Sequence, residues 1–160
     1  MLKCFVAFVL ILGCFSIGQS KNARLSLRLR TLRHMVDGLM ALESEIRHRL
    51  SPLPEALEVA GRFSPLFSSA SLYIEREGAE AALRHAAAEH LEGAEEQEIL
   101  ESLAPGLLSC EETGLLQSIS LCRMRTAALL ERLETEGRRL AKLYSGGGAA
   151  AGFLAVILLL

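Results

Sequence analysis

Apolar residues between positions 25 and 50 recur in alternating steps of four and three, which places them on one face of an α-helix. The members of this series are Leu25, Leu29, Leu32, Val36, Leu39, Ile46 and Leu50. Glu43 occupies the one position of the series that is not apolar. The pattern predicts a long amphipathic helix, and Glu43 must find a partner within the fold or on another protein.

A second series with the same spacing lies near the other end of the chain. Its members are Leu115, Ile119, Cys122, Thr126, Leu129, Leu133, Leu140 and Leu143, and Glu136 fills its gap. This series predicts a second long amphipathic helix, which begins near Ser109 or Cys110.

Proline and glycine divide the chain between these two helices. Pro52 and Pro54 end the first helix near Leu50, because proline lacks the backbone donor that a helix interior needs. Ser51 is expected to cap the next helix. Further helices are predicted over about residues 52–61, 65–78, 79–91 and 95–103, with a last break at Pro105-Gly106. No segment has the pattern of a strand, so the predicted fold class is all-α, a six-helix antiparallel bundle.

Both ends of the chain are strongly apolar. The runs are CFVAFVLILGCFSI at residues 4–17 and AAAGFLAVILLL at residues 149–160. A helix over residues 1–18 is about 27 Å long, close to the hydrocarbon thickness of a membrane. The sequence therefore predicts transmembrane segments at residues 1–18 and 146–160 that continue the two long helices, around a helical domain at residues 19–145. Two helices that lead to the same membrane must run antiparallel, packed at about +20°.

Positive charge is concentrated beside both apolar ends, on the side of the central domain. The residues are Lys21, Arg24, Arg28, Arg30 and Arg33 after the first segment, and Arg138, Arg139 and Lys142 before the second. Lys and Arg near a span stay on the cytoplasmic face, so we expect a cytoplasmic domain with both termini at the opposite face. Their expected partner is anionic membrane lipid. This clustering and the net charge of −2 argue against nucleic-acid binding.

The residues Ile11-Leu12-Gly13-Cys14 support a competing topology. They resemble a lipobox, at which a signal peptide is cleaved and the cysteine acylated, and this would place the domain outside the cell. The single Lys3 before the apolar run and the basic residues after it favour the cytoplasmic topology. In that reducing compartment, Cys110 and Cys122 are expected to be small apolar helix residues.

Glycines mark the approach to the second apolar segment. Gly148 and Gly152 have the small-xxx-small spacing that lets membrane helices pack closely. Residues 146–148 also suit a hinge where the helix meets the membrane, and the sequence leaves both interpretations open.

The sequence predicts no enzyme, metal ion, cofactor or small-molecule substrate. His85 and His90 are five residues apart, whereas a zinc-binding helix of the HExxH kind needs four. The two imidazoles are therefore expected on different faces of a helix, in contact with solvent. The glycine run at residues 146–148 does not follow a strand, so it is not a phosphate loop.

Glu43, Glu45 and Glu55 bracket the corner formed by Pro52 and Pro54. About 30 residues of helix hold this corner roughly 45 Å from the membrane. The three acids are either solvated groups at helix ends or a docking edge for a cytoplasmic partner. Intramolecular candidates to pair with Glu43 are Arg123, Arg125 and Arg132.

Three segments resemble the stage III sporulation protein AB family of endospore-forming bacteria. They are the opening MLK with its apolar run through Leu12-Gly13-Cys14, residues 42–57 (LESEIRHRLSPLPEAL), and the ending of Lys142-Leu143-Tyr144, glycines and VILLL. The resemblance implies a domain similar to the cytoplasmic domains of type II secretion and type IV pilus platform proteins, which sit above a hexameric ATPase.

The resemblance also implies a role. The protein is expected in the mother-cell membrane around the forespore, as a subunit of a secretion-like complex required for endospore formation. Its implied partners are the stage III sporulation protein AA type of ATPase and other membrane subunits of the complex. The competing function is that of an exported lipoprotein with a helical binding domain, anchored through Cys14.

Overall fold

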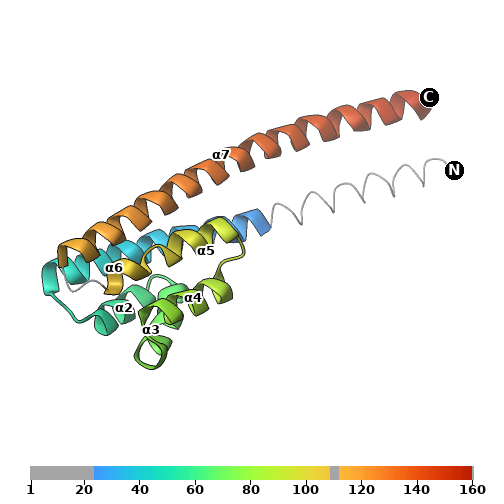
Figure 1. Ribbon diagram of the computed structural model, residues 1–160. Helices are drawn as coiled ribbons and strands as arrows, with labels where there is room; N and C mark the ends of the chain where they lie inside the picture. The colour runs from blue at the N-terminus through green and yellow to red at the C-terminus, as the bar shows by residue number, and fades with distance from the viewer. Residues whose placement is uncertain (1–23, 109–111, 160) are drawn as a thin grey trace. The chain divides into compact units, whose positions relative to one another are not determined.

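The computed structural model describes residues 24–108 and 112–159, and for residues 140–159 it describes the backbone alone. Within these ranges every regular element is a helix, which confirms the all-α helical bundle (Figure 1). The chain divides into two compact units, Arg28–Glu131 and the paired segments Met1–Leu27 and Arg132–Leu160.

The helices follow one another with short connections. The first helix covers residues 24–44 and continues as the π-helix η1, Glu45–Arg49. The others are α2 (Leu53–Gly61), α3 (Pro65–Glu77), α4 (Ala79–His90), α5 (Ala94–Glu101), α6 (Ala104–Leu108) and α7 (Glu112–Leu159). The predicted elements are confirmed to within a few residues, and α6 is an addition to them.

Two local predictions were wrong. The N-cap of α2 is Pro52, whose carbonyl oxygen accepts from the Ala56 N–H at 3.0 Å. Ser51 lies one residue before this cap, and its hydroxyl donates to Glu45 Oε2 at 3.3 Å. Pro105-Gly106 was expected to interrupt the helical structure, but both residues lie inside the short helix α6. A proline near a helix start loses no backbone hydrogen bond, because its N–H would have no partner in the helix.

Gly106 is required by the packing of α6 on α7. A Cβ atom at this position would lie 2.2 Å from Ser118 Oγ and 2.3 Å from Ser118 Cβ. The two helices can therefore approach only because residue 106 has no side chain.

The unit Arg28–Glu131 encloses the core. Within it α3 packs along both α2 and α4, and α4 packs against α5 and α6. The residues that α7 buries here are Ile119, Cys122, Thr126 and Leu129. All four were predicted from the spacing of the second series, which is thereby confirmed for this part of the helix.

The first helix buries a face that is rotated from the predicted one. Its buried apolar residues are Leu32, Met35, Leu39, Leu42 and Ile46. Val36 is half-buried and Leu50 is 70% exposed, although the series placed both in the core. The rotation arises because this helix contacts α3 as well as α7, so its buried face extends past the original stripe.

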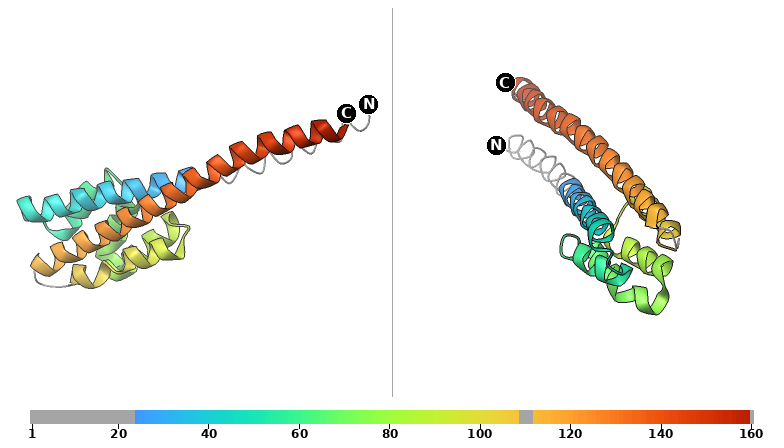
Figure 2. Two further views of the ribbon diagram at one scale, coloured as in Figure 1. Left: turned by 90° about the horizontal axis from the view of Figure 1, so that it is seen from above. Right: turned by 90° about the vertical axis from the view of Figure 1, so that its left-hand side faces the viewer.

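The second unit contains residues 24–27 and the remainder of α7. Leu25 lies against Gly137, where an added Cβ would be 2.8 Å from Leu25 Cδ2. Beyond this contact the backbone of α7 stays helical through residues 146–148 and on to Leu159, so it shows no hinge at the glycines (Figure 2).

The predicted first transmembrane segment, residues 1–18, lies outside the described residues. Gly148 and Gly152 lie on the part of α7 for which the backbone alone is described. Among the described residues, none of the helices combines the length and the apolar character needed to cross a membrane.

Candidate partner-docking corner

Glu43 is held within the domain. Its side chain is 14% exposed, and its Oε1 accepts from Arg47 Nη2 at 2.9 Å. Arg123 Nε on α7 lies 3.3 Å from Glu43 Oε2, close enough for an ion pair but without the geometry of a hydrogen bond. The structure therefore selects Arg123 from the predicted candidates, and Glu43 joins the first helix to α7.

Glu45 is also turned inward. Its side chain is 12% exposed, and its Oε1 lies 3.3 Å from Arg49 Nη1. Its second oxygen accepts from Ser51, which fixes the loop that follows η1. This carboxylate is used to build the corner, so reversing its charge would disturb the local fold.

Glu55 differs from the other two acids. It lies in the first turn of α2 and is exposed. Because α2 packs against η1, Glu55 belongs to the same corner as the inward-turned acids. The predicted docking edge therefore reduces to one exposed carboxylate, and its role in docking stays a prediction.

Leu50 is the unexpected residue of the corner. It terminates η1 in the left-handed conformation, with φ 52° and ψ 32°. This conformation costs a residue with a Cβ about 1–2 kcal/mol, and the Leu50 side chain is also 70% exposed. The sequence series missed this because Leu50 has the spacing of a core residue, although a helix end without glycine was a signal of strain.

An ion pair between a half-buried arginine and a buried glutamate joins the first helix to α5. Arg28 Nε pairs with Glu96 Oε1, and the Glu96 side chain is 1% exposed. Glu96 Oε2 accepts from the Gly93 N–H at 3.2 Å at the start of α5. A Cβ at Gly93 would lie 2.5 Å from Arg28 Nη2 and 3.1 Å from Glu96 Oε2, so a larger residue would have to displace the ion pair.

Arg28 was assigned to membrane lipid by the sequence, since it belongs to the basic flank of the first apolar segment. The signal that could have found its partner is the acid at Glu96, three residues after Gly93. An acid in this position suits a helix start and can reach back to the preceding backbone. The 68 residues between Arg28 and Glu96 hid the pairing itself.

The two histidines of α4 have different surroundings. His90 Nε2 lies 2.7 Å from Ser69 Oγ on α3, and the Ser69–His90 hydrogen bond ties the two helices together. His85 is exposed and stacks on Tyr73 with ring centroids 4.3 Å apart. The solvent contact predicted for His85 is confirmed, whereas His90 is only 25% exposed.

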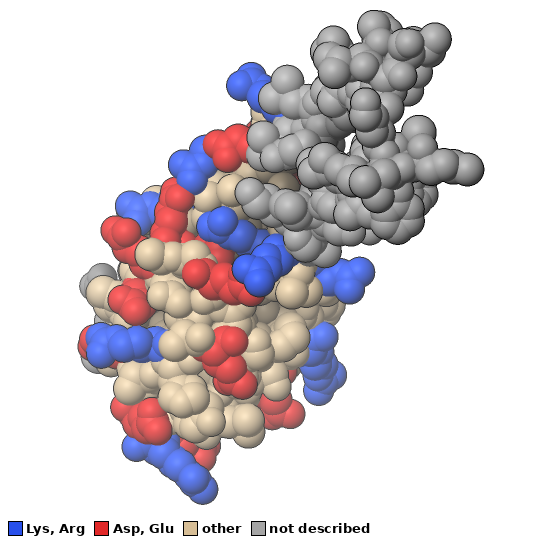
Figure 3. Space-filling view, turned by 90° about the vertical axis from the view of Figure 1, so that its right-hand side faces the viewer, with Lys and Arg blue, Asp and Glu red and all other residues tan. Residues whose placement is uncertain are grey.

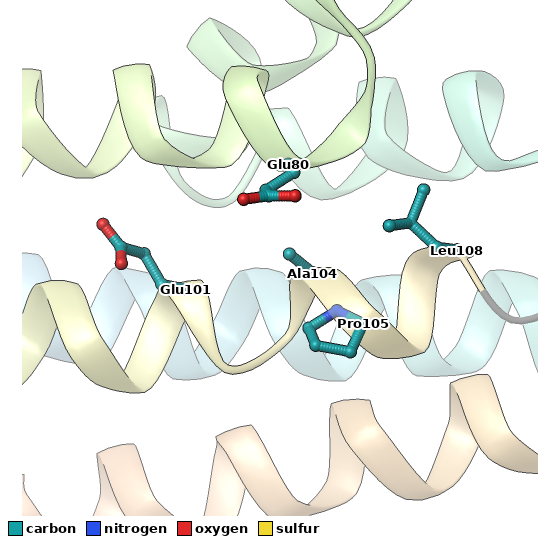
Figure 4. Close-up of a pocket in the computed structure, with 5 residues that line it drawn as sticks. All are labelled: Glu80, Glu101, Ala104, Pro105 and Leu108. Carbon is teal, nitrogen blue, oxygen red and sulfur yellow. The ribbon is translucent and has the colours of Figure 1, made fainter.

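A shallow hollow of about 240 Å³ lies between α4 and the α5–α6 segment (Figure 4). Its lining residues are Glu80, Glu101, Ala104, Pro105 and Leu108. Arg84 Nη2 lies 2.7 Å from Glu80 Oε1, and Arg84 Nε lies 4.0 Å from Glu101 Oε1. Since both carboxylates share the Arg84 guanidinium, the hollow is a seam between helices that Arg84 bridges.

Surface charges are interspersed on the face shown in Figure 3, where basic and acidic side chains alternate. Several pairs form along single helices, such as Arg138 with Glu134 at 3.2 Å. Such exposed pairs contribute little to stability.

Cys122 is the free cysteine of the described residues, and it is 1% exposed. Its Sγ donates to the Ile99 carbonyl oxygen at 3.5 Å. Burial raises the pKa of the Cys122 thiol to about 12, although Thr126 and Arg125 act in the opposite direction. The prediction of a small apolar helix residue is confirmed for Cys122, and Cys110 lies outside the described residues.

We expect Cys122 to resist thiol reagents in the folded protein. With Cys4, Cys14 and Cys110 replaced by serine, labelling by a maleimide at pH 8 should be at least about 100-fold slower than in denaturant, because the thiolate is the nucleophile. Because burial raises the pKa, the Cys122 thiol ionises at lower pH in the unfolded chain than in the native protein. The buried neutral thiol therefore contributes fully to the free energy of unfolding below pH 9.0, and this contribution is lost as the pH rises towards about 12. Fast labelling of the native protein would contradict the burial.

The comparisons with known proteins agree with this fold. A model of the family described as stage III sporulation protein AB matches residues 3–160. The chain belongs to the stage III sporulation protein AB family. It is therefore a sporulation protein, and the resemblance seen in the sequence is confirmed.

A solved structure of a stage III sporulation protein AB is similar to this chain, with a TM-score of 0.61 and 22% sequence identity. The alignment covers 70% of this chain and 97% of the solved one, so the likeness extends over nearly all of that structure. At this level of identity the comparison supports the helical fold alone. No protein in the curated set matches the chain.

Proposed function

We propose that the protein is a membrane-anchored platform subunit of a secretion-like sporulation complex, and that it works through protein contacts rather than by catalysis. The observation that carries this proposal is the contact between Leu25 and Gly137. It brings residues that follow the first apolar segment beside residues that precede the second. A protein anchored in one membrane by both of its strongly apolar ends requires the helical segments next to those ends to lie together.

The orientation follows from charge. The basic residues beside both apolar ends face the central domain in the sequence, which favours a cytoplasmic domain. In this arrangement the mother-cell membrane holds both ends, where Gly148 and Gly152 are available for packing with other membrane subunits.

The topology is tested with a reporter enzyme that is active only outside the cytoplasm. Gly78 is the best insertion point, because it is exposed and an added Cβ there would meet no atom within 4 Å. We expect the reporter to be silent at Gly78 and active when fused after Leu160. The reverse result at Gly78 would overturn the cytoplasmic topology and favour the lipoprotein anchored through Cys14.

The corner is proposed to dock the AA-type ATPase of the complex. It lies at the turn where the first helix ends, and Glu55 presents an exposed carboxylate there. Charges at the edge of an interface affect partner choice and association rate more than stability. Glu55 can therefore contribute to docking without being needed for the fold.

Replacing Glu55 by lysine should weaken binding of the purified full-length protein to the AA-type ATPase by about tenfold, a change of roughly 1.4 kcal/mol. The melting temperature should fall only slightly, since charge in the first turn of an exposed helix contributes about 0.3–1 kcal/mol. Glu77→Lys is the matched control, because Glu77 is exposed at the end of α3 and the change in net charge is identical. Equal binding by both variants would remove Glu55 from the docking site.

A further inference from the structure

Leu50 combines a left-handed backbone with an exposed apolar side chain, and both are unfavourable for leucine. Among the described residues it is the one non-glycine residue with positive φ, and its side chain is 70% exposed. Glycine or asparagine would adopt this backbone more easily, and a polar side chain would suit the solvent better. A strained, exposed leucine is therefore explained by something other than the stability of the domain.

The corner holds Leu50 in a fixed position. The Ser51 hydroxyl donates to Glu45, and Pro52 and Pro54 restrict the backbone at the start of α2. A side chain presented from a fixed backbone loses less conformational entropy on binding than one on a mobile loop. The local structure thus prepares Leu50 to make a contact with another molecule.

Two arginines flank Leu50 on η1. The Arg47 and Arg49 side chains are 53% and 72% exposed, and each is oriented by the acid four residues earlier. A guanidinium has five donors, so both arginines retain donors for a further carboxylate. An apolar centre within a polar rim is the arrangement found at energetically important sites of protein interfaces.

We propose that Leu50 is the anchor residue of a protein-binding surface. It inserts into an apolar pocket of the partner, and carboxylates at the rim of that pocket meet Arg47 and Arg49. This assignment deepens the proposed function. The experiments that use the AA-type ATPase as the binding partner rest on that proposed function. The partner surface that fits has an apolar pocket for Leu50 with carboxylates facing Arg47 and Arg49 and, where the partner is the ATPase, a basic group facing Glu55.

The test separates the fold of the corner from its binding. Leu50→Asn and Leu50→Gly both suit the left-handed backbone, so their melting temperatures should equal or exceed that of the unaltered protein. Leu50→Met restores an apolar side chain. Leu72→Asn is the matched control, because Leu72 is 72% exposed but lies in the regular helix α3.

In sporulating cells that carry each variant as the sole copy, Leu50→Asn and Leu50→Gly should lower the yield of heat-resistant spores at least about tenfold. Leu50→Met and Leu72→Asn should leave it unchanged. In purified full-length proteins, the same two Leu50 variants should bind the AA-type ATPase at least about tenfold more weakly. Binding by the unaltered protein should also weaken with rising salt, since the rim is charged.

The outcomes are distinct. A normal spore yield with Leu50→Asn would overturn the anchor role of Leu50. If the unaltered protein fails to bind the ATPase while Leu50→Asn still lowers the spore yield, the anchor stands and the proposed ATPase contact is wrong. If Leu50→Asn instead converts an oligomer of this chain to smaller species in sedimentation, the occupant is a second copy and the acidic-bordered partner is excluded.

Discussion

Replacing Arg28 by alanine is expected to destabilise the helical domain by about 2–4 kcal/mol, somewhat less than for a fully buried pair because the Arg28 side chain is 31% exposed. The reason is that Glu96 remains behind with its side chain 1% exposed and without the guanidinium that compensates its charge. The change also removes the ion pair that joins the first helix to α5, whose two residues are 68 positions apart in the sequence. Thermal and denaturant unfolding of the purified protein, followed by circular dichroism, measure the loss.

Two further variants identify the cause of the loss. In the Arg28→Ala protein, Glu96→Gln should recover at least half of the lost stability, since a neutral amide oxygen still accepts from the Gly93 N–H. Arg84→Ala is the control, because its pair with Glu80 is exposed on both sides and contributes about 0–1 kcal/mol. If Glu96→Gln recovers nothing, the uncompensated charge is not the source of the destabilisation.

The parts of the fold that the sequence predicted correctly are those that depend on neighbours along the chain. Proline chemistry placed the end of the first helix at Leu50, and the structure ends η1 there. The spacing along α7 predicted its buried face, including Thr126, whose hydroxyl donates to the Cys122 carbonyl oxygen at 2.8 Å. A polar residue in an apolar series can thus be buried because its own helix satisfies it.

One prediction reached across the fold. Glu43 interrupts the apolar series of the first helix, so Arg123, Arg125 and Arg132 of the last helix were expected as candidate partners, and the structure pairs it with Arg123. The prediction succeeded because a carboxylate on the apolar face of a helix needs a compensating partner. It could not distinguish a docking acid from a structural one, since that depends on how deeply the side chain is buried.

The rest of the site depends on contacts that spacing does not encode. The face of the first helix is rotated because α3 and α7 share it, and α3 is reached only through the folding of the intervening chain. The spacing did not predict the strain at Leu50, because a leucine at a helix end is compatible with ordinary burial; the absence of a glycine there was the one signal of it. The structure adds the exposure and the backbone angle that turn this residue into a candidate for binding.

Replacing Gly38 by alanine is expected to destabilise the domain by about 2 kcal/mol, although alanine is the better helix former. A Cβ at residue 38 would lie 2.5 Å and 2.7 Å from ring carbons of Phe67, which is 0% exposed, and 3.0 Å from Ser64 Cβ. Overpacking of this kind costs about 1–3 kcal/mol and occasionally more. The gain in helix propensity is about 1 kcal/mol and is outweighed, because a buried ring between two helices cannot move aside.

Gly137→Ala is the matched control for this prediction. Gly137 also lies in a long helix, but its added Cβ would meet only the flexible end of Leu25, so the variant should be as stable as the unaltered protein or more stable. Adding Phe67→Leu to Gly38→Ala should then cost less than Phe67→Leu alone, because a smaller side chain makes room for the new methyl group. Strictly additive losses in this double-mutant cycle would show that Gly38 and Phe67 do not share the space between the first helix and α3.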